Sequence, residues 1–201
     1  MSDADHPFAE IEATFRKSVS ALTKAGVPFL LGGTLASWAR GGPESRNDLD
    51  LMVKPADAER ALEVLEEVGM RGERPPESWL LKAWDGEVLV DLIFRPKGFE
   101  ITDAVIERGE VLEVLAMEVR VISLEDLLVS KLLVLDDHQL DLAPPLRIAR
   151  ALREKIDWAE VHSRTAESPY AAAFFTLIER LHLIDGTRAG HHDRADVRVL
   201  N

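Results

Sequence analysis

The chain has 201 residues, of which 46% are hydrophobic and 30% charged, a composition typical of a folded globular protein and not of a disordered one. It contains no cysteine, which excludes disulfides and thiolate-bound zinc, and its formal net charge of −12 argues against a generic duplex-binding surface, because such binding needs cations against phosphates. No apolar run reaches the ~20 residues of a membrane helix and the acidic N-terminus does not resemble a signal peptide, so we expect a cytoplasmic protein with no membrane partner.

Apolar periodicity and turn residues predict mixed helices and strands up to Ile122, and helices alone after it. In chain order, the predicted elements are a helix over 7–25, a strand over 27–31, a short helix over 34–40, a strand over 48–53, a helix over 55–69, a hairpin over 78–94 that turns at Asp85-Gly86, a short helix over 101–108, one or two strands within 111–122, and helices over 124–137, 144–158 and 169–184. This order predicts an α+β fold with a boundary near Ile122.

Two aspartates interrupt the apolar strand at 48–53. Residues i and i+2 of a strand point to the same face, so Asp48 and Asp50 should project side by side with Cα atoms roughly 6.6 Å apart, while Leu49 and Leu51 enter the core. Two neighbouring carboxylates repel each other and need a cation, and Mg²⁺ takes carboxylate oxygens while keeping positions open for phosphates. The alternative is an edge strand with solvated carboxylates.

A third aspartate, Asp91, stands alone among apolar residues in "VLVDLIF". If its strand neighbours 48–53, three carboxylates converge, which is the composition of a two-metal site for phosphoryl or nucleotidyl transfer. The alternative for Asp91 is a structural salt bridge.

Gly32-Gly33-Thr34 lie between the strand at 27–31 and the helix that follows it. Glycine lets backbone amides approach a phosphate closely, and the Thr34 hydroxyl adds a donor. Arg46, just before the two aspartates, could neutralise them or contact a phosphate, and a surface charge is an equally good interpretation.

The glycine pair, the Asp48-Leu49-Asp50 motif and Asp91 on a later strand together resemble the nucleotidyltransferase superfamily of the polymerase-β type. The "SLEDLLVSKLLVL" helix resembles small bacterial members, which include antibiotic adenylyltransferases and abortive-infection toxin nucleotidyltransferases. The resemblance implies a mixed nucleotidyltransferase-type sheet flanked by helices over residues 1–122, the catalytic domain, and a small helical C-terminal domain over 123–201.

The resemblance also implies roles for single residues. Asp48, Asp50 and Asp91 would be the catalytic carboxylates and the ligands of Mg²⁺ or Mn²⁺. The nucleotide-binding residues would be Gly32, Gly33, Thr34, Arg46 and Lys131, the last of which matches a helix lysine that often meets phosphates in toxin-like members. The alternative for Lys131 is a solvated lysine on an amphipathic helix.

The sequence therefore predicts a metal-dependent enzyme that transfers a nucleoside monophosphate from an NTP such as ATP to an acceptor hydroxyl and releases pyrophosphate. The acceptor could be a small molecule, an RNA or a protein. Two alternatives remain: a non-catalytic nucleotide- or partner-binding module of the same fold, and one half of a toxin–antitoxin pair with an antitoxin partner.

Overall fold

A seven-stranded mixed sheet forms the first half of the protein, with the order β3-β4-β5-β2-β1-β7-β6. The computed structural model describes residues 8–43 and 48–184. The strands are β1 (Phe29–Leu31), β2 (Leu49–Val53), β3 (Arg71–Glu73), β4 (Leu80–Asp85), β5 (Val88–Ile93), β6 (Glu110–Val114) and β7 (Met117–Val121). The β2–β5 and β1–β7 pairs are parallel and the other pairs antiparallel.

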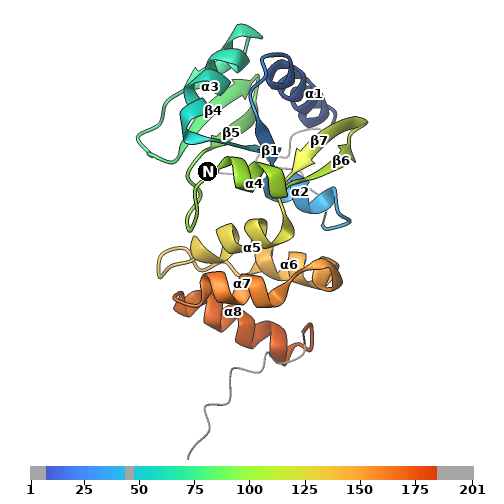
Figure 1. Ribbon diagram of the computed structural model, residues 1–201, viewed down its shortest axis with the longest axis vertical. Helices are drawn as coiled ribbons and strands as arrows, with labels where there is room; N and C mark the ends of the chain where they lie inside the picture. The colour runs from blue at the N-terminus through green and yellow to red at the C-terminus, as the bar shows by residue number, and fades with distance from the viewer. Residues whose placement is uncertain (1–7, 44–47, 185–201) are drawn as a thin grey trace, which may run out of the picture.

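Helices pack on the sheet and then continue as a stack beside it, drawn below the sheet in Figure 1. The α-helices are α1 (Phe8–Lys24), α2 (Gly33–Trp38), α3 (Ala58–Glu67), α4 (Asp103–Arg108), α5 (Leu124–Leu133), α6 (Ala143–Leu152), α7 (Trp158–Thr165) and α8 (Pro169–Arg180). Helices α1 and α3 contact each other and β5, while α5 contacts α6, α7 and α8. No helix in the described ranges is both long and apolar enough to span a bilayer.

Local sequence explains where these helices begin and what they bury. Along α1, Ile11, Phe15 and Leu22 recur at helical spacing and are at most 2% exposed. Ser123 caps α5 by accepting a hydrogen bond from the Asp126 amide, and Ser168 caps α8 in the same way before a proline in its first turn.

The predicted α+β class and the order of sheet and helices are confirmed, with differences in detail. The segment 111–122 forms two strands, and the hairpin turn is centred on Gly86-Glu87, since Asp85 pairs with Val88. Strand β3 was not predicted, because "RGE" has no apolar alternation. The helix predicted over 124–137 ends at Leu133.

The helix predicted over 144–158 is present but shorter, and a further helix that was not predicted follows it. Helix α6 ends at Leu152, a 3₁₀ turn spans Arg153–Lys155, and α7 begins at Trp158. The reason is Asp157, whose side chain accepts a hydrogen bond from the Glu160 amide and so starts a new helix. The domain boundary near Ile122 stays a prediction.

A buried carboxylate joins the two halves of the molecule. Asp126 in α5 is 0% exposed, and its oxygens accept hydrogen bonds from Arg108 of α4 at 3.0 Å and from Arg164 of α7 at 2.6 Å. A buried charge held by two guanidinium groups fixes the position of α5 relative to the sheet. This matters for the site because α5 also carries Lys131.

Candidate active site

The parallel pairing of β2 and β5 brings two of the three predicted carboxylates together. Asp50 is the direct register partner of Asp91. Leu49 and Leu51 are 1% and 0% exposed on the other face of β2, as the alternation predicted. Asp48 precedes the first residue of β2, and its charge raises the pKa of both Asp50 and Asp91. The three carboxylates therefore share one electrostatic environment at the beginning of β2.

The pKa of Asp50 is strongly raised. Burial is the main cause that raises its pKa to about 7, and the neighbouring charge of Asp91 is the next, while Lys131 acts in the opposite direction. A carboxyl that keeps its proton near neutral pH lacks a sufficient cation. Such a shift in a half-buried side chain is typical of functional sites.

Asp91 has a partner that the sequence interpretation had not identified. Lys82 faces it across the β4–β5 hairpin, with Nζ 3.4 Å from Asp91 Oδ1, so the salt-bridge alternative has a structural basis. Burial nevertheless raises the pKa of Asp91 against the effect of Lys82. Asp91 Oδ1 is buried without a hydrogen bond of good geometry, which leaves a lone pair available to a cation.

Gly33 lies directly against the Asp50 carboxylate. Its φ is +60°, and a Cβ at this position would overlap Asp50 Oδ2. The neighbouring Gly32 donates its amide to the Asp50 carbonyl at 2.8 Å, which continues the β1–β2 pairing. The structure thus requires glycine here for contact with the aspartate and for the left-handed backbone conformation. The predicted role in approaching a phosphate stays a prediction.

Lys131 of α5 lies close enough to Asp50 for the two charges to interact. Its side chain is half-buried, and burial lowers its pKa while the charge of Asp50 raises it. Arg147 of α6 also lies close enough for its charge to lower the pKa of Lys131. A cation between carboxylates and a second cation is well placed to contact a phosphate.

The chemistry of these residues fits a divalent cation, although they do not form a ready cage. Within the described ranges, no three His, Asp or Glu side chains are grouped so as to hold a metal ion. Two observations favour a cation: Asp91 Oδ1 is buried and has Lys82 Nζ at 3.4 Å without a hydrogen bond of good geometry, and the pKa of Asp50 is raised. Mg²⁺ uses few protein carboxylates and completes its shell with water and phosphate oxygens, which suits such a partial set.

The remaining nucleotide-binding predictions fall on Thr34 and Arg46. Thr34 is half-buried in the first turn of α2, beside Gly33. Arg46 lies outside the described residues. Neither role is tested by these observations, and both stay predictions.

Two cavities lie near the junction of sheet and helices. The first, of about 510 Å³, includes Lys131 in its lining together with Met52 and Ile93. Met52 and Ile93 follow Asp50 and Asp91 by two positions on their strands, so this cavity adjoins the carboxylates.

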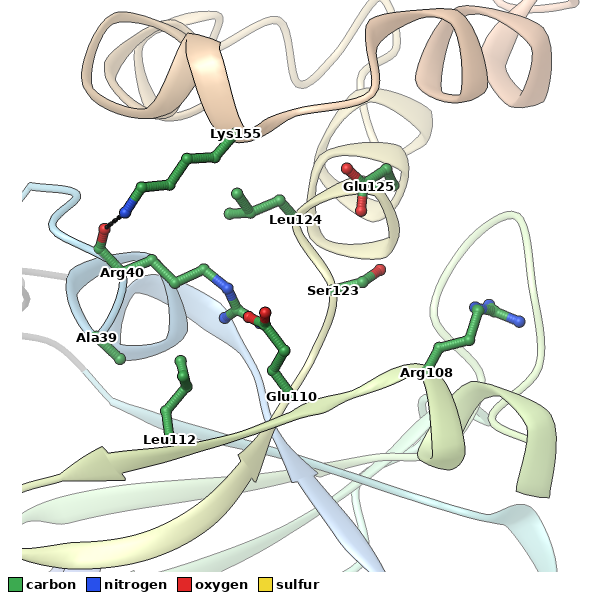
Figure 2. Close-up of a pocket in the computed structure, with 9 residues that line it drawn as sticks. All are labelled: Ala39, Arg40, Arg108, Glu110, Leu112, Ser123, Leu124, Glu125 and Lys155. Atoms are coloured by element: carbon green, nitrogen blue, oxygen red, sulfur yellow. Dashed lines mark hydrogen bonds and ion pairs between the residues drawn. The ribbon is translucent and has the colours of Figure 1, made fainter.

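The second cavity, of about 570 Å³, lies at the other end of α2 and is shown in Figure 2. None of the predicted site residues lines it. Its cations are engaged: Arg40 pairs with Glu110 at 3.3 Å, Lys155 donates to the Arg40 carbonyl at 2.9 Å, and Arg108 holds Asp126. It is therefore less suited to a charged ligand than the first cavity.

Comparison with solved structures gives the same fold at low sequence identity. The solution structure of the antibiotic-resistance factor ANT(2'')-Ia is similar with a TM-score of 0.57 and 16% identity, over 85% of this chain and 96% of that one. The crystal structure of ANT(2'')-Ia with adenylyl-2''-tobramycin gives 0.50 and 18%, over 85% and 98%. A Thermotoga maritima protein described as a nucleotidyltransferase gives 0.50 and 16%, over 63% and 86%.

Comparison with curated protein sequences gave no match. Residues 12–165, more than half of the chain, match a family described as "Nucleotidyl transferase of unknown function (DUF2204)". The predicted resemblance to nucleotidyltransferases is therefore confirmed, and the protein belongs to this nucleotidyl transferase family.

Proposed function

We propose that this protein transfers a nucleoside monophosphate from an NTP, with ATP as the first candidate, to the hydroxyl group of an acceptor. The observation that carries the proposal is the register pairing of Asp50 with Asp91 beside Gly33. Membership of a nucleotidyl transferase family supports the reaction class. Adenylyl transfer is suggested by the adenylyl-tobramycin bound to a structural neighbour of low identity.

The proposed reaction is an in-line displacement at the α-phosphorus. The acceptor oxygen bonds to this phosphorus, the bond to the bridging oxygen of the β-phosphate breaks, and pyrophosphate leaves with the electron pair. When bound, Mg²⁺ or Mn²⁺ would offset the phosphate charge. Asp48, Asp50 and Asp91 would be its ligands.

The protein's own groups have distinct parts in this proposal. Lys131 would contact a phosphate oxygen, because its ammonium group is close enough to Asp50 for the two charges to affect each other's pKa. Gly33 leaves the space over Asp50 free of a side chain. Asp91 would accept the proton of the acceptor hydroxyl and pass it to water.

A pyrophosphate-release assay with each of the four NTPs, with and without Mg²⁺ or Mn²⁺, tests the proposal. Mass spectrometry of a cell extract incubated with the protein and labelled NTPs would identify the labelled acceptor. We expect metal-dependent release by the wild type. We expect a fall of several orders of magnitude in Asp91→Asn with nucleotide affinity retained, because the amide cannot take the proton or offset charge.

The second candidate is a non-catalytic nucleotide- or partner-binding module, of the kind that could act as half of a toxin–antitoxin pair. The observation that favours it is the Lys82–Asp91 ion pair, which gives Asp91 a structural role. In that case Asp91→Asn would lower the melting temperature. Turnover per folded molecule would be the same in the variant as in the wild type, or absent from both. Measuring melting temperature, nucleotide affinity and turnover on one preparation separates the two.

A further inference from the structure

The cavity of about 510 Å³ beside the carboxylates has the size of a small-molecule site. Met52 and Ile93 form part of its wall and share their sheet face with Asp50 and Asp91. A molecule in this cavity would lie along the sheet directly next to the proposed point of transfer.

The position of the cavity assigns it to the acceptor side of the site. In the sheet order β4-β5-β2-β1, Gly33 follows β1 on one side of Asp50, and Asp91 lies on β5 on the other side. The cavity is lined by Ile93 of β5, by Trp79 just before β4 and by the 95–97 segment just after β5. Most of these residues lie on the side of Asp91, and Met52 of β2 extends the lining toward Gly32, where an added Cβ would lie 3.2 Å from Met52 Cε.

The charges of the lining have the opposite sign to those of the whole chain. Arg95, Lys97 and Lys131 line the cavity, and no Asp or Glu is among its lining residues, although the chain has a net charge of −12. In the described part of the chain, Arg95 has no carboxylate partner. Its guanidinium carbon lies 5.7 Å from the centroid of the Phe94 ring. Lys97 has Asp136 as a neighbouring charge. An anionic group is the natural complement of this lining.

The rest of the lining is apolar and includes an aromatic side chain at its edge. Trp79 is 42% exposed, which is unusual for a large ring that is also part of a cavity wall. Its backbone carbonyl accepts hydrogen bonds from the Phe94 and Arg95 amides at 3.0 and 3.2 Å, so its position is fixed to the end of β5. These bonds fix the backbone of Trp79, and its exposed indole offers a flat apolar surface to a ligand.

We propose that this cavity binds the acceptor, and that the acceptor is a small hydroxyl compound with a flat apolar body and a carboxylate or phosphate group. This proposal rests on the proposed nucleotidyl transfer, because the term acceptor has meaning only for that reaction. It excludes a polycationic aminoglycoside from this cavity, since such a ligand would meet Arg95 and Lys97. It also disfavours a long RNA, because the chain as a whole is strongly acidic.

The test uses three probes that share one ring system and differ in charge: 6-hydroxy-2-naphthoate, 2-naphthol and 2-naphthylmethylammonium. Calorimetry with the full chain, without nucleotide, should give the order anion, neutral, cation, with the anion at least ~10-fold tighter than the cation, as expected for a charge-assisted contact. The Arg95→Ala/Lys97→Ala variant should remove this preference. Lys24→Ala, an exposed cation at the end of α1, is the matched control and should keep it.

Two further arms test the identity of the site and the size of its ligand. Saturation with α,β-methylene-ATP and Mg²⁺ should change the affinity for the naphthoate by less than about threefold from its value without nucleotide, because the two ligands would occupy different sides of Asp50. Competition between them would show that the cavity belongs to the nucleotide and would overturn the proposal. A short single-stranded RNA that displaces the naphthoate with a higher affinity than AMP does would overturn the small-molecule assignment.

The first arm also separates this inference from the function on which it rests. Equal affinity for the three probes, or an unchanged preference in the Arg95→Ala/Lys97→Ala variant, would overturn the assigned acceptor chemistry even if the protein releases pyrophosphate. Failure of nucleotide binding in the wild type would overturn the transfer reaction, whatever the probes show.

Discussion

Replacing Asp50 by asparagine should stabilise the metal-free protein at pH 8. Burial, followed by the charge of Asp91, raises the pKa of Asp50 from 3.8 to about 7. The folded state therefore binds the proton more tightly than the unfolded chain. This contribution to stability is fully present below pH 3.8 and is lost as the pH rises through about 7.

The size of the effect follows from the shift. A difference of about 3 pKa units corresponds to about 4 kcal/mol between low pH and pH 8. Asp50 is only half-buried and Lys131 lies near it, so solvent and counter-charge screening should reduce this to about 2–3 kcal/mol. Asparagine carries no charge at any of these pH values and should remove the loss.

Urea unfolding in EDTA at pH 5, 6, 7 and 8 measures this prediction. The free energy of unfolding of Asp50→Asn minus that of the wild type should increase with pH, and Mg²⁺ should narrow the difference by stabilising only the wild type. Glu87→Gln, an exposed carboxylate in the β4–β5 turn, should show no such trend. A constant difference across the pH range, or a variant that is less stable at pH 8, would refute the reasoning.

Three other substitutions test separate parts of the structure. Gly33→Ala should lower the free energy of unfolding by about 1–3 kcal/mol through its positive φ and its overlap with Asp50, and an Asp50→Ala background should recover the part due to overlap in a double-mutant cycle. Asp126→Asn should cost about 2–4 kcal/mol in urea unfolding, because two arginines lose their buried counter-charge, and a cost below 1 kcal/mol would contradict the role of Asp126 in holding α5. Lys131→Gln should weaken Mg²⁺–nucleotide binding roughly tenfold in calorimetry, as loss of a charge-assisted contact predicts, and unchanged affinity would leave Lys131 a structural residue.

The sequence was sufficient for the central strands because their pattern breaks a strong rule. A carboxylate within an apolar strand is so unfavourable that Asp50 and Asp91 stand out without any structure, and alternation placed Leu49 and Leu51 in the core. The sequence did not show that β2 and β5 are neighbours, and the convergence of the carboxylates depended on that condition. The structure supplies it through the parallel pairing of the two strands.

Features that depend on distant parts of the chain were not predictable in the same way. The position of Lys131 beside Asp50 depends on how α5 docks, and this is decided by the contacts of Asp126 with Arg108 and Arg164. The pairing of Lys82 with Asp91 could have been derived by counting outward from the correct hairpin turn. The start of α7 could have been found from Asp157, which is a good N-cap residue three positions before Glu160.

The length of the turn between β4 and β5 determines which side chain of β4 faces Asp91. Lys82 and Asp91 face each other because the turn centred on Gly86-Glu87 has two residues. One inserted residue would shift β4 by one position and present a neighbouring apolar residue of β4 to Asp91, while Lys82 would turn to the other face of the sheet. Variation in the length of this surface turn, several residues from the carboxylates, would therefore alter the ionisation of the site while every residue of the site itself stayed the same.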